Sequence, residues 1–399
     1  MSHWPKDLYK PFKRVTTAGK HIPAFDGLRC FAILWVAFYH LNGSFSHKAP
    51  LREWVPDEGV LHTILTHGRQ GVPLFFALSG FFLCLPFARH YLQGTNAIEL
   101  RTYYVRRFIR IVPPYWIAVL TITVIYAVMG RYSLEYLVSH AAASLGFVHT
   151  FIFEEINVLN SVFWALEVEM QFYLIAPLMA YLYFLMGPVA RMATTMLLIG
   201  LLPFLQAAYE RSIAFTLLDF LQYFLAGFAI ADVYVSNEGL RFKHGLIPLV
   251  ALPVILFATY DDSIIERIIY PFMIISLYLV VLFNPFWEKV FSRKSMVTIG
   301  GISYSVFLIH FPIIGFLGTY TMPIPLTGTY YVDFLTQCVI ILPAILVLSF
   351  IFYLAAERPF MLIRPGNRAR SVENVGPPEK IGTDSDDAGT GSDVMNIAK

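Results

Sequence analysis

The chain of 399 residues is 57% hydrophobic and only 14% charged, with a formal net charge of +2 and a mean hydropathy of +0.61. A soluble domain carries about 25% charged residues, so this composition excludes a soluble globular protein of this size. We therefore expect a lipid bilayer as a partner, and no nucleic acid. Cys30, Cys84 and Cys338 lie far apart in apolar runs, which predicts packing residues and neither a metal site nor a disulfide framework.

Apolar runs of about 17–25 residues recur along the chain between short charged loops, a pattern typical of an all-α polytopic membrane protein. We predict about ten transmembrane helices in this fold. They cover residues 25–43, 71–88, 109–129, 164–186, 192–208, 213–234, 246–259, 267–284, 299–319 and 334–356. Residues 134–153 are only weakly apolar and are predicted to form an interfacial or re-entrant segment instead of a full span.

The predicted organisation has three parts: a cytoplasmic N-terminal tail at 1–24, a transmembrane domain at 25–360 and a disordered cytoplasmic tail at 366–399. The last segment is rich in Gly, Ser, Asp and Pro and too poor in apolar residues to offset the cost of ordering. The basic N-terminus has no signal-peptide pattern. Lys and Arg gather in both tails and in the loops after the second and eighth spans, and such residues accumulate on the cytoplasmic side. We therefore expect a multi-pass protein with both termini cytoplasmic, in the inner membrane if the source is bacterial.

The first predicted span carries an ionisable residue at each end of a continuous apolar run. Arg29 and His40 are eleven residues apart, or roughly three helical turns, so both project from one face about 16 Å apart along the axis. Ionisable groups inside a span are costly and usually functional. The pair therefore indicates a path for an anionic molecule with a reactive far end. The alternative is a snorkelling arginine with a histidine near a helix end.

A second basic feature lies at the start of the third predicted span. Arg107 and Arg110 are three residues apart on one helix face, a spacing that suits a bidentate clamp for phosphates. The same spacing also fits ordinary positive-inside anchors. The Pro113–Pro114 pair that follows predicts a broken or kinked helix start, because proline lacks the N–H that a helix needs.

Two later spans contain further ionisable residues. Glu167 and Glu169 stand on different faces of an otherwise apolar helix, near its predicted outer boundary. His310 lies just before Pro312, where a lone histidine is at least as good a candidate for a structural hydrogen bond as for catalysis. The sequence contains no Walker A, HExxH or GxSxG motif.

Six stretches, taken together and in order, resemble the membrane acyltransferase-3 family over about residues 25–360. They are FDGLRCFAILWVAFYH, GVPLFFALSGFFL, YYVRRFIRIVPPYW, FWALEVEMQFY, ISYSVFLIHFP and AAERPF. The resemblance implies about ten transmembrane helices and an enzyme that moves an acyl group, usually acetyl, from cytoplasmic acyl-CoA to a hydroxyl of a sugar or other acceptor. It implies acyl-CoA as the donor substrate and no permanently bound cofactor.

The resemblance also implies roles for individual residues. Arg29 and His40 fall on the family's Arg-x10-His motif, and Arg107 and Arg110 fall on its Arg-x-x-Arg motif. Glu169 is the glutamate of the WSLxxExxFY motif. The implied catalytic residues are His40, Arg29 and Glu169. The remaining matches are implied to bind substrate or to support the structure: Trp164, Tyr173, His310 and Glu357.

Some features depart from the family pattern. Ala165 stands where serine is usual, and Cys30 follows Arg29 where glycine is common. The printed sequence has no stretch like the SGNH-type domain that some members carry, so we expect no relay through such a domain.

The implied chemistry places acyl-CoA phosphates on Arg29, Arg107 and Arg110, and makes His40 the general base on the acceptor hydroxyl, since histidine titrates near neutral pH. Glu169 or Glu357 would orient His40 or bind the acceptor. A covalent acyl-histidine stays open, as do the acyl chain, the acceptor and the oligomeric state. The competing class is a secondary transporter or lipid flippase, which would also have about ten spans with buried charges. A membrane sensor or scaffold is a third, but it leaves the buried His and Arg residues without a task.

Overall fold

The structure, a computed structural model, describes residues 21–49, 60–213, 215–241, 263–324, 326–327 and 329–363. These ranges contain helices and turns and no β-strand, as the all-α prediction requires. The predicted C-terminal tail, and the predicted N-terminal tail up to residue 20, lie outside them.

Nine segments of the described chain are helical, long and apolar enough to cross a membrane, which makes the chain a multi-pass membrane protein. Seven of them are single helices: α1 (Pro23–Lys48), α4 (Leu100–Val128), α7 (Trp164–Leu185), α8 (Pro188–Ile213), α9 (Leu217–Ser236), α11 (Ile264–Phe283) and α14 (Ser303–Thr321). The other two are composite. One joins α2 (Val60–Thr66), the 3-10 helix η3 (His67–Gln70) and α3 (Gly71–Gln93); the other joins α15 (Tyr330–Phe352), the π-helix η4 (Tyr353–Glu357) and α16 (Arg358–Met361). The remaining predicted span, 246–259, lies outside the described residues.

Short helices occupy the regions between several spans. The weakly apolar residues 134–153 form α5 (Leu134–Leu145) and α6 (His149–Phe153), of 12 and 5 residues. Neither is long enough to cross a bilayer, as predicted. Two more, α12 (Pro285–Phe291) and α13 (Lys294–Gly301), precede α14, so the ninth span starts a few residues later than predicted.

The prediction of a broken helix at the double proline is wrong, because α4 continues through Pro113 and Pro114. Prolines are tolerated inside a membrane helix when its neighbours hold the surrounding backbone. Here the Tyr304 hydroxyl on α14 donates to the carbonyl of Ile111 at 2.7 Å. The Tyr115 hydroxyl donates to the carbonyl of Ser144 on α5 at 3.0 Å. Both bonds tie the proline turn of α4 to adjacent helices.

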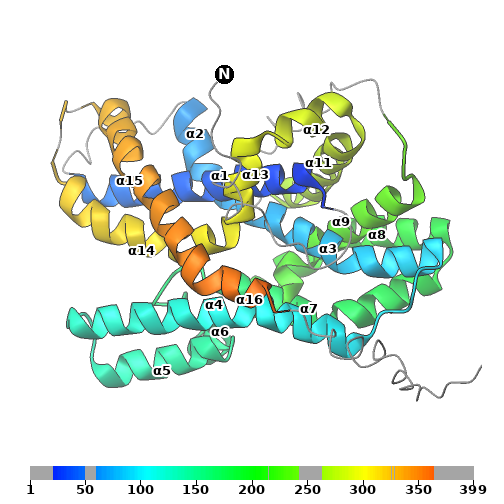
Figure 1. Cartoon of the computed structure of the whole chain (residues 1–399), viewed down its shortest axis with the longest axis horizontal. Helices are drawn as coiled ribbons and strands as arrows, with labels where there is room; N and C mark the ends of the chain where they lie inside the picture. The colour runs from blue at the N-terminus through cyan, green and yellow to red at the C-terminus, as the bar shows by residue number, and fades with distance from the viewer. Residues whose placement is uncertain are drawn as a thin grey trace, which may run out of the picture.

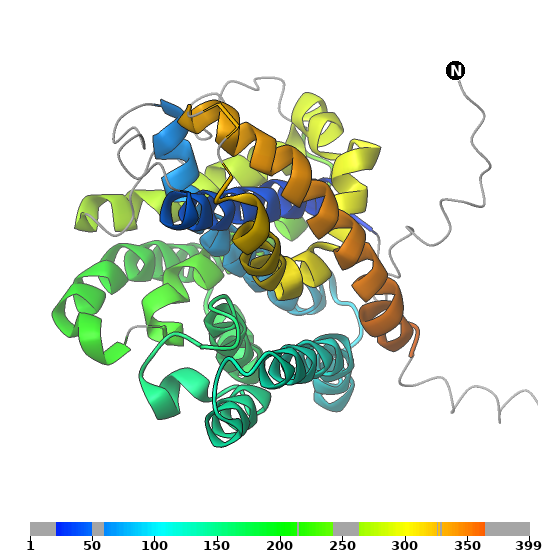
Figure 2. The ribbon, with the colours of Figure 1, turned by 90° about the vertical axis from the view of Figure 1, so that its left-hand side faces the viewer.

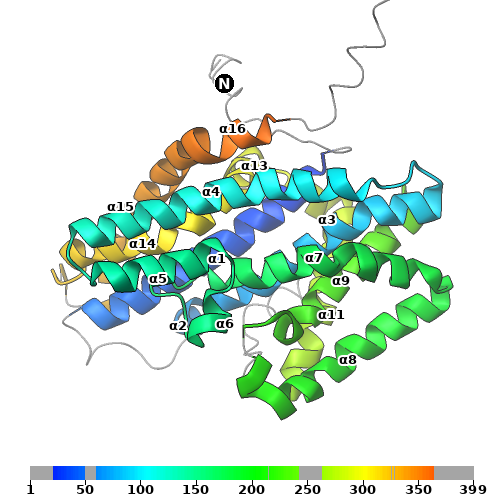
Figure 3. The same ribbon diagram turned by 90° about the horizontal axis from the view of Figure 1, so that it is seen from below.

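The helices form two groups at opposite ends of the molecule (Figure 1). Seen from below, α4 runs alongside α5, with α14 and α15 close by, while α8, α9 and α11 gather at the other end (Figure 3). At that second end α3 packs along α9, where a Cβ on Gly80 or Gly227 would collide with the opposing backbone. Small residues permit such close helix approach in membranes.

An aromatic core fixes three helices, two of which carry the motif stretches GVPLFFALSGFFL and FWALEVEMQFY. Phe224 on α9 stacks on Phe76 of α3 at 4.8 Å between ring centroids, and on Phe172 of α7 at 4.0 Å. All three rings are buried. Stacked aromatic pairs add about 0.5–1.5 kcal/mol each beyond their burial, so this cluster holds α3 and α7 against α9 and sets where their polar side chains lie.

Three helices run in the same direction and end together. In Figure 1, α1, α4 and α14 end at the left, and Figure 2 faces that end. Residues from the C-terminal halves of these three helices line one common cavity. Residues from their N-terminal halves line another. The fold thus provides two cavities, one after the other, along α1.

Candidate active site

Helix α1 carries Arg29 and His40 into two neighbouring cavities. Arg29 lines a narrow cavity of about 110 Å³, and His40 lines a large cavity of about 1490 Å³. The helix is continuous from Pro23 to Lys48, so the predicted spacing of roughly three turns between them holds.

The narrow cavity gathers the three arginines that the sequence singles out, together with both candidate carboxylates and a tyrosine. Its lining includes Arg29, Arg107, Arg110, Glu169, Tyr173 and Glu357. These residues come from α1, α4, α7 and the π-helix η4, which are far apart in the sequence. Single-turn π-helices are frequent at functional sites, and here one brings Glu357 into the cavity.

Arg29 is held by a buried carboxylate that the sequence analysis missed. Asp26 is fully buried and accepts from Arg29 Nη1 at 2.7 Å; its second oxygen lies 2.7 Å from His21 Nε2. The Arg29 guanidinium also lies over the Phe82 ring, 4.7 Å from its centroid. A Cβ on Gly300 would collide with the Asp26 carbonyl, so only glycine lets α13 pack this closely. The sequence does contain a sign of this contact, because in FDGLR a carboxylate stands three residues before the arginine.

The two clamp arginines differ in their contacts. Arg107 Nη2 donates to the Phe82 carbonyl at 3.3 Å, and its guanidinium lies 5.8 Å from the centroid of the Tyr173 ring. Arg110 makes no side-chain hydrogen bond or ion pair within the described chain. Arg110 therefore has guanidinium donors available for an anion at the narrow cavity.

The candidate carboxylates belong to the narrow cavity. Glu169 accepts hydrogen bonds from the hydroxyls of Ser79 and Tyr173, and Glu357 accepts one from Ser305 at 2.6 Å. His40 lines the large cavity, which neither glutamate lines. Within the described chain neither glutamate contacts His40 through a hydrogen bond, so the expectation that one of them orients His40 or binds the acceptor stays a prediction. Glu167 lies elsewhere again, accepting from the backbone N–H of Thr150 at 3.0 Å.

His40 and His310, which sequence reasoning treated separately, lie side by side. Their ring centroids are 5.3 Å apart. His310 Nδ1 lies 2.9 Å from the carbonyl of Val306 and 3.0 Å from that of Phe307. Carbonyls only accept, so Nδ1 carries the proton. His310 Nε2 is then an acceptor, buried and without a hydrogen-bond partner within the described chain.

Trp164 forms part of the wall of the large cavity. Its ring stacks on Phe220 with centroids 5.1 Å apart and meets Phe215 at 5.1 Å. The contacts are aromatic and hold the indole in place, so Trp164 shapes the space in front of His40.

The two cavities are adjacent, because four residues line both of them: Val36, Val72, Ala165 and Phe307. We call these four residues the waist. Ala165 stands at the position where the family pattern has serine, so this chain has a methyl group in the waist and no hydroxyl.

The family profile described as an acyltransferase domain matches residues 22–354. The chain belongs to the acyltransferase-3 family. The match covers every described element from α1 to α15 and all residues that line the two cavities except Glu357. No solved structure matches this acyltransferase-3 chain significantly.

Several relatives of this acyltransferase-3 chain have names that state an activity. Over 335 residues the chain is 24% identical to a predicted O-acetyltransferase of Staphylococcus aureus strain COL, covering 75% of the chain and 52% of that protein. Over 189 residues it is 28% identical to the peptidoglycan O-acetyltransferase OatA of Listeria monocytogenes, covering 44% of the chain and 27% of OatA. A predicted peptidoglycan O-acetyltransferase of Bacillus subtilis, YrhL, is 28% identical over 193 residues, which are 46% of the chain and 27% of YrhL. The chain thus spans about half the length of the S. aureus relative.

Proposed function

We propose that this chain is an integral-membrane O-acyltransferase that moves an acyl group, acetyl by default, from cytoplasmic acyl-CoA to a hydroxyl of a carbohydrate or glycoconjugate. The observation that carries the proposal is the pair of cavities along α1. One is lined by three arginines and the other by His40, and they meet at the waist. A donor and an acceptor can approach His40 from opposite ends.

The donor enters from the arginine end. Phosphates of acyl-CoA bind Arg110 and its neighbours Arg29 and Arg107, since guanidinium groups bind phosphate oxygens through paired hydrogen bonds. A cavity of about 110 Å³ is too small for the nucleotide. The adenosine therefore stays outside this cavity while the phosphates reach the arginines, and the linear pantetheine arm carries the thioester past the waist to His40.

The chemistry at His40 is general base catalysis. His40 takes the proton of the acceptor hydroxyl as that oxygen attacks the thioester carbonyl. The carbon–sulfur bond then breaks. CoA leaves as a thiolate, while the proton taken from the acceptor hydroxyl stays on His40. Because donor and acceptor meet at one histidine from two sides, direct transfer is the simpler route, and a covalent acyl-histidine is not needed.

Orientation follows from the distribution of basic residues. Lys and Arg accumulate on the cytoplasmic side, and the predicted basic loops lie at the end of α1 where Arg29 lies. We place both termini and the narrow cavity on the cytoplasmic side, with the large cavity opening away from it. The names of the Listeria and Bacillus relatives support a glycan acceptor such as peptidoglycan.

A binding measurement tests the donor site. In detergent-purified protein, Arg107→Ala combined with Arg110→Ala should weaken acetyl-CoA binding by at least about 10-fold, because charge-assisted hydrogen bonds are lost. The matched control is Arg101→Ala combined with Arg106→Ala, which removes two exposed arginines from the same helix that line neither cavity. Equal binding by both double variants would reject the clamp. Substrate movement across vesicles without release of CoA thiol would favour a transporter.

A further inference from the structure

The large cavity has a basic wall, and two of its cations, Lys48 and Arg131, lie at the end where α1 and α4 end. Among described residues its lining carries Lys48, Arg69, Arg131 and Arg267, and a single carboxylate, Asp219. These cations come from the end of α1, from η3, from the turn after α4 and from the first turns of α11. Four separate elements thus bring positive charge to one space. His47 and Arg131 are exposed, so the cavity reaches the surface at this end.

Among the described residues, Lys48 has only neutral hydrogen-bond partners, and it lines this cavity. Its Nζ donates to the carbonyl of Gly315 at 2.7 Å and to Thr319 Oγ1 at 3.1 Å, both on α14. An ammonium has three donors, so one remains for a ligand. The two bonds hold the ammonium at a fixed place beside α14, about 12 Å along α1 from His40. A fixed ammonium that pairs with no carboxylate of the described chain is suited to bind an anion.

Arg131 supplies the second charge. Its guanidinium lies over the rings of Tyr126 and Tyr132, 4.8 and 5.6 Å from their centroids. Within the described chain it forms no ion pair and no side-chain hydrogen bond. The two tyrosine rings hold the guanidinium without using its N–H donors. Lys48 and Arg131 line the same cavity, so both cations can attract one carboxylate or phosphate there.

We propose that the acceptor glycan carries an anionic group, a carboxylate or a phosphate, and that Lys48 and Arg131 bind this group while an acceptor hydroxyl reaches His40. The inference rests on the proposed acyltransferase function and adds the chemical class of its acceptor. At about two helical turns from His40, the anionic group belongs to a neighbouring part of the glycan and takes no part in the acyl transfer. A neutral acceptor gains nothing from the two cations.

The test uses purified full-length protein, radiolabelled acetyl-CoA and an envelope glycan pool of the source organism, separated by anion exchange into neutral and anionic fractions. We expect label in the anionic fraction. Lys48→Gln combined with Arg131→Gln should raise the anionic glycan concentration needed for half-maximal transfer by at least about 10-fold, with the KM for acetyl-CoA unchanged. Lys48→Arg combined with Arg131→Lys keeps both charges and should retain transfer.

Controls separate this inference from the function on which it rests. Lys294→Gln combined with Arg101→Gln removes two exposed charges that line neither cavity and should change nothing. Label in the neutral fraction, or an unchanged requirement for anionic glycan in the Gln double variant, overturns the anionic acceptor and leaves the acyltransferase function standing. An unchanged requirement for anionic glycan in the Gln double variant would mean that Lys48 and Arg131 only anchor the chain at lipid headgroups. No label in either fraction, with no acetyl-CoA binding, rejects the proposed function and the inference with it.

Amidation of the glycan carboxylates, compared with removal of its phosphates, identifies the anion. Loss of acceptance after one treatment assigns that group to the Lys48–Arg131 site. Acceptance that survives both treatments overturns the inference.

Discussion

His40 and His310 lie with their ring centroids 5.3 Å apart, and His310 has its Nδ1 proton committed to two backbone carbonyls. The buried Nε2 of His310 is consequently an acceptor with no partner within the described chain. We expect His40 to donate to this nitrogen once the two rings turn toward each other. That bond would fix which nitrogen of His40 keeps its lone pair for the acceptor hydroxyl. We assign His310 as a positioning residue for His40.

Two variants of His310 separate its nitrogens. His310→Asn keeps a donor near the position of Nδ1 and loses the Nε2 acceptor. We expect kcat to fall, by less than the roughly 10²–10⁴-fold attributed to a general base itself. The KM for acetyl-CoA and the unfolding temperature should stay close to those of the wild type. His310→Gln, whose amide reaches the Nε2 position, should recover part of the rate. A His310→Asn protein with wild-type kcat would show that the two histidines are only packed together.

Blocking the waist tests the path between the cavities. Ala165→Leu puts three more carbon atoms where both cavities meet, and we expect acetyl transfer to drop by at least about 10-fold while the nucleotide still binds outside. Overpacking costs about 1–3 kcal/mol, so the unfolding temperature is measured alongside. Leu178→Phe adds bulk to an exposed position on the same helix and should leave transfer unchanged. Normal transfer by a folded Ala165→Leu protein would place the thioester path elsewhere.

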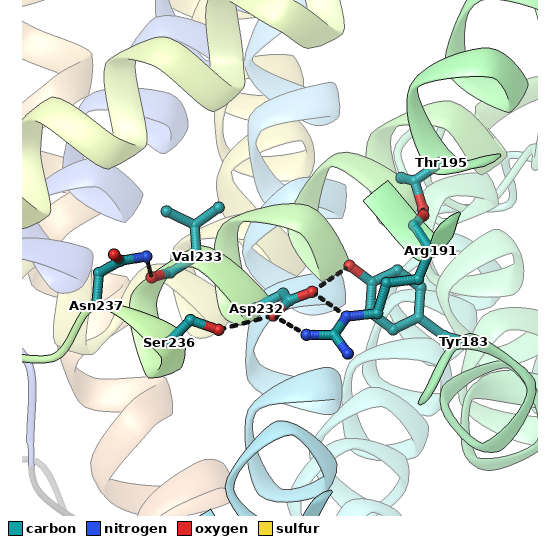
Figure 4. Close-up of polar contacts among 7 residues, drawn as sticks. All are labelled: Tyr183, Arg191, Thr195, Asp232, Val233, Ser236 and Asn237. Atoms are coloured by element: carbon teal, nitrogen blue, oxygen red, sulfur yellow. Dashed lines mark hydrogen bonds and ion pairs between the residues drawn. The ribbon is translucent and has the colours of Figure 1, made fainter. Parts of the chain in front are cut away.

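We expect a buried ion pair between α8 and α9 to stabilise the fold (Figure 4). Arg191 on α8 donates to both oxygens of Asp232 on α9, at 2.6 and 2.9 Å. The hydroxyls of Tyr183 and Ser236 donate to the same carboxylate at 2.9 and 3.1 Å. Only 8% and 5% of the Arg191 and Asp232 side chains are exposed. Every oxygen of the carboxylate is therefore paired, and the cluster joins α7, α8 and α9.

Asp232→Asn leaves a buried guanidinium without its counter-charge, which typically costs about 3–5 kcal/mol. We expect a clear fall in the unfolding temperature in detergent, with acetyl-CoA binding intact in the protein that stays folded. The comparison is Arg241→Ala, which removes a partly exposed pair with Glu288 at 3.7 Å and should have little effect. Equal unfolding temperatures for both variants would contradict a stabilising role for the cluster.

The histidine pair outside the spans predicts a pH dependence. His140 Nδ1 on α5 lies 2.8 Å from His149 Nε2 on α6. Burial, and then the neighbouring His140, lower the pKa of His149 from 6.5 to about 4. Burial also lowers the pKa of His140, against the opposing pull of Glu155. Folding thus favours the neutral rings, so stability is full above about pH 6.5 and falls as the pH drops toward 4.

Unfolding temperatures measured between pH 7.5 and 4.5 test this. The wild type should lose stability steadily below about pH 6.5, where the unfolded chain binds protons that the folded chain rejects. His149→Gln removes one of those protons and should show a shallower decline. Parallel curves for the two proteins would mean that His149 takes no part in the pH response.

Hydrophobic periodicity predicted most of the fold, because span length is set by bilayer thickness and is visible in a single sequence. Helix α1 was predictable in this way. The clustering of Arg29 with Arg107 and Arg110 was also predictable, because the order and direction of the spans place these residues on the same side of the membrane. The double proline of α4 was misread, because the bonds from Tyr304 and Tyr115 that steady the helix come from tertiary contacts.

The parts of the site that sequence missed depend on which helices meet. Nothing in the run ISYSVFLIHFP states that His310 lies beside His40, and nothing near Lys48 states that Arg131 faces the same cavity. Glu169 or Glu357 was expected to orient His40 or to bind the acceptor. The structure adds that Glu169 lines the narrow cavity, where Ser79 and Tyr173 donate to it. Local pattern fixes the face of a helix, and packing between helices decides which faces share a cavity.

The central claim is that His40 performs the transfer chemistry while the arginines hold the donor. It is tested most directly by measuring CoA thiol released from acetyl-CoA by purified wild-type and His40→Ala proteins with a glycan acceptor pool, alongside acetyl-CoA binding. We predict thiol release by the wild type, a loss of roughly 10²–10⁴-fold in the variant, and equal acetyl-CoA binding by both. Release by His40→Ala at the wild-type rate would contradict the account.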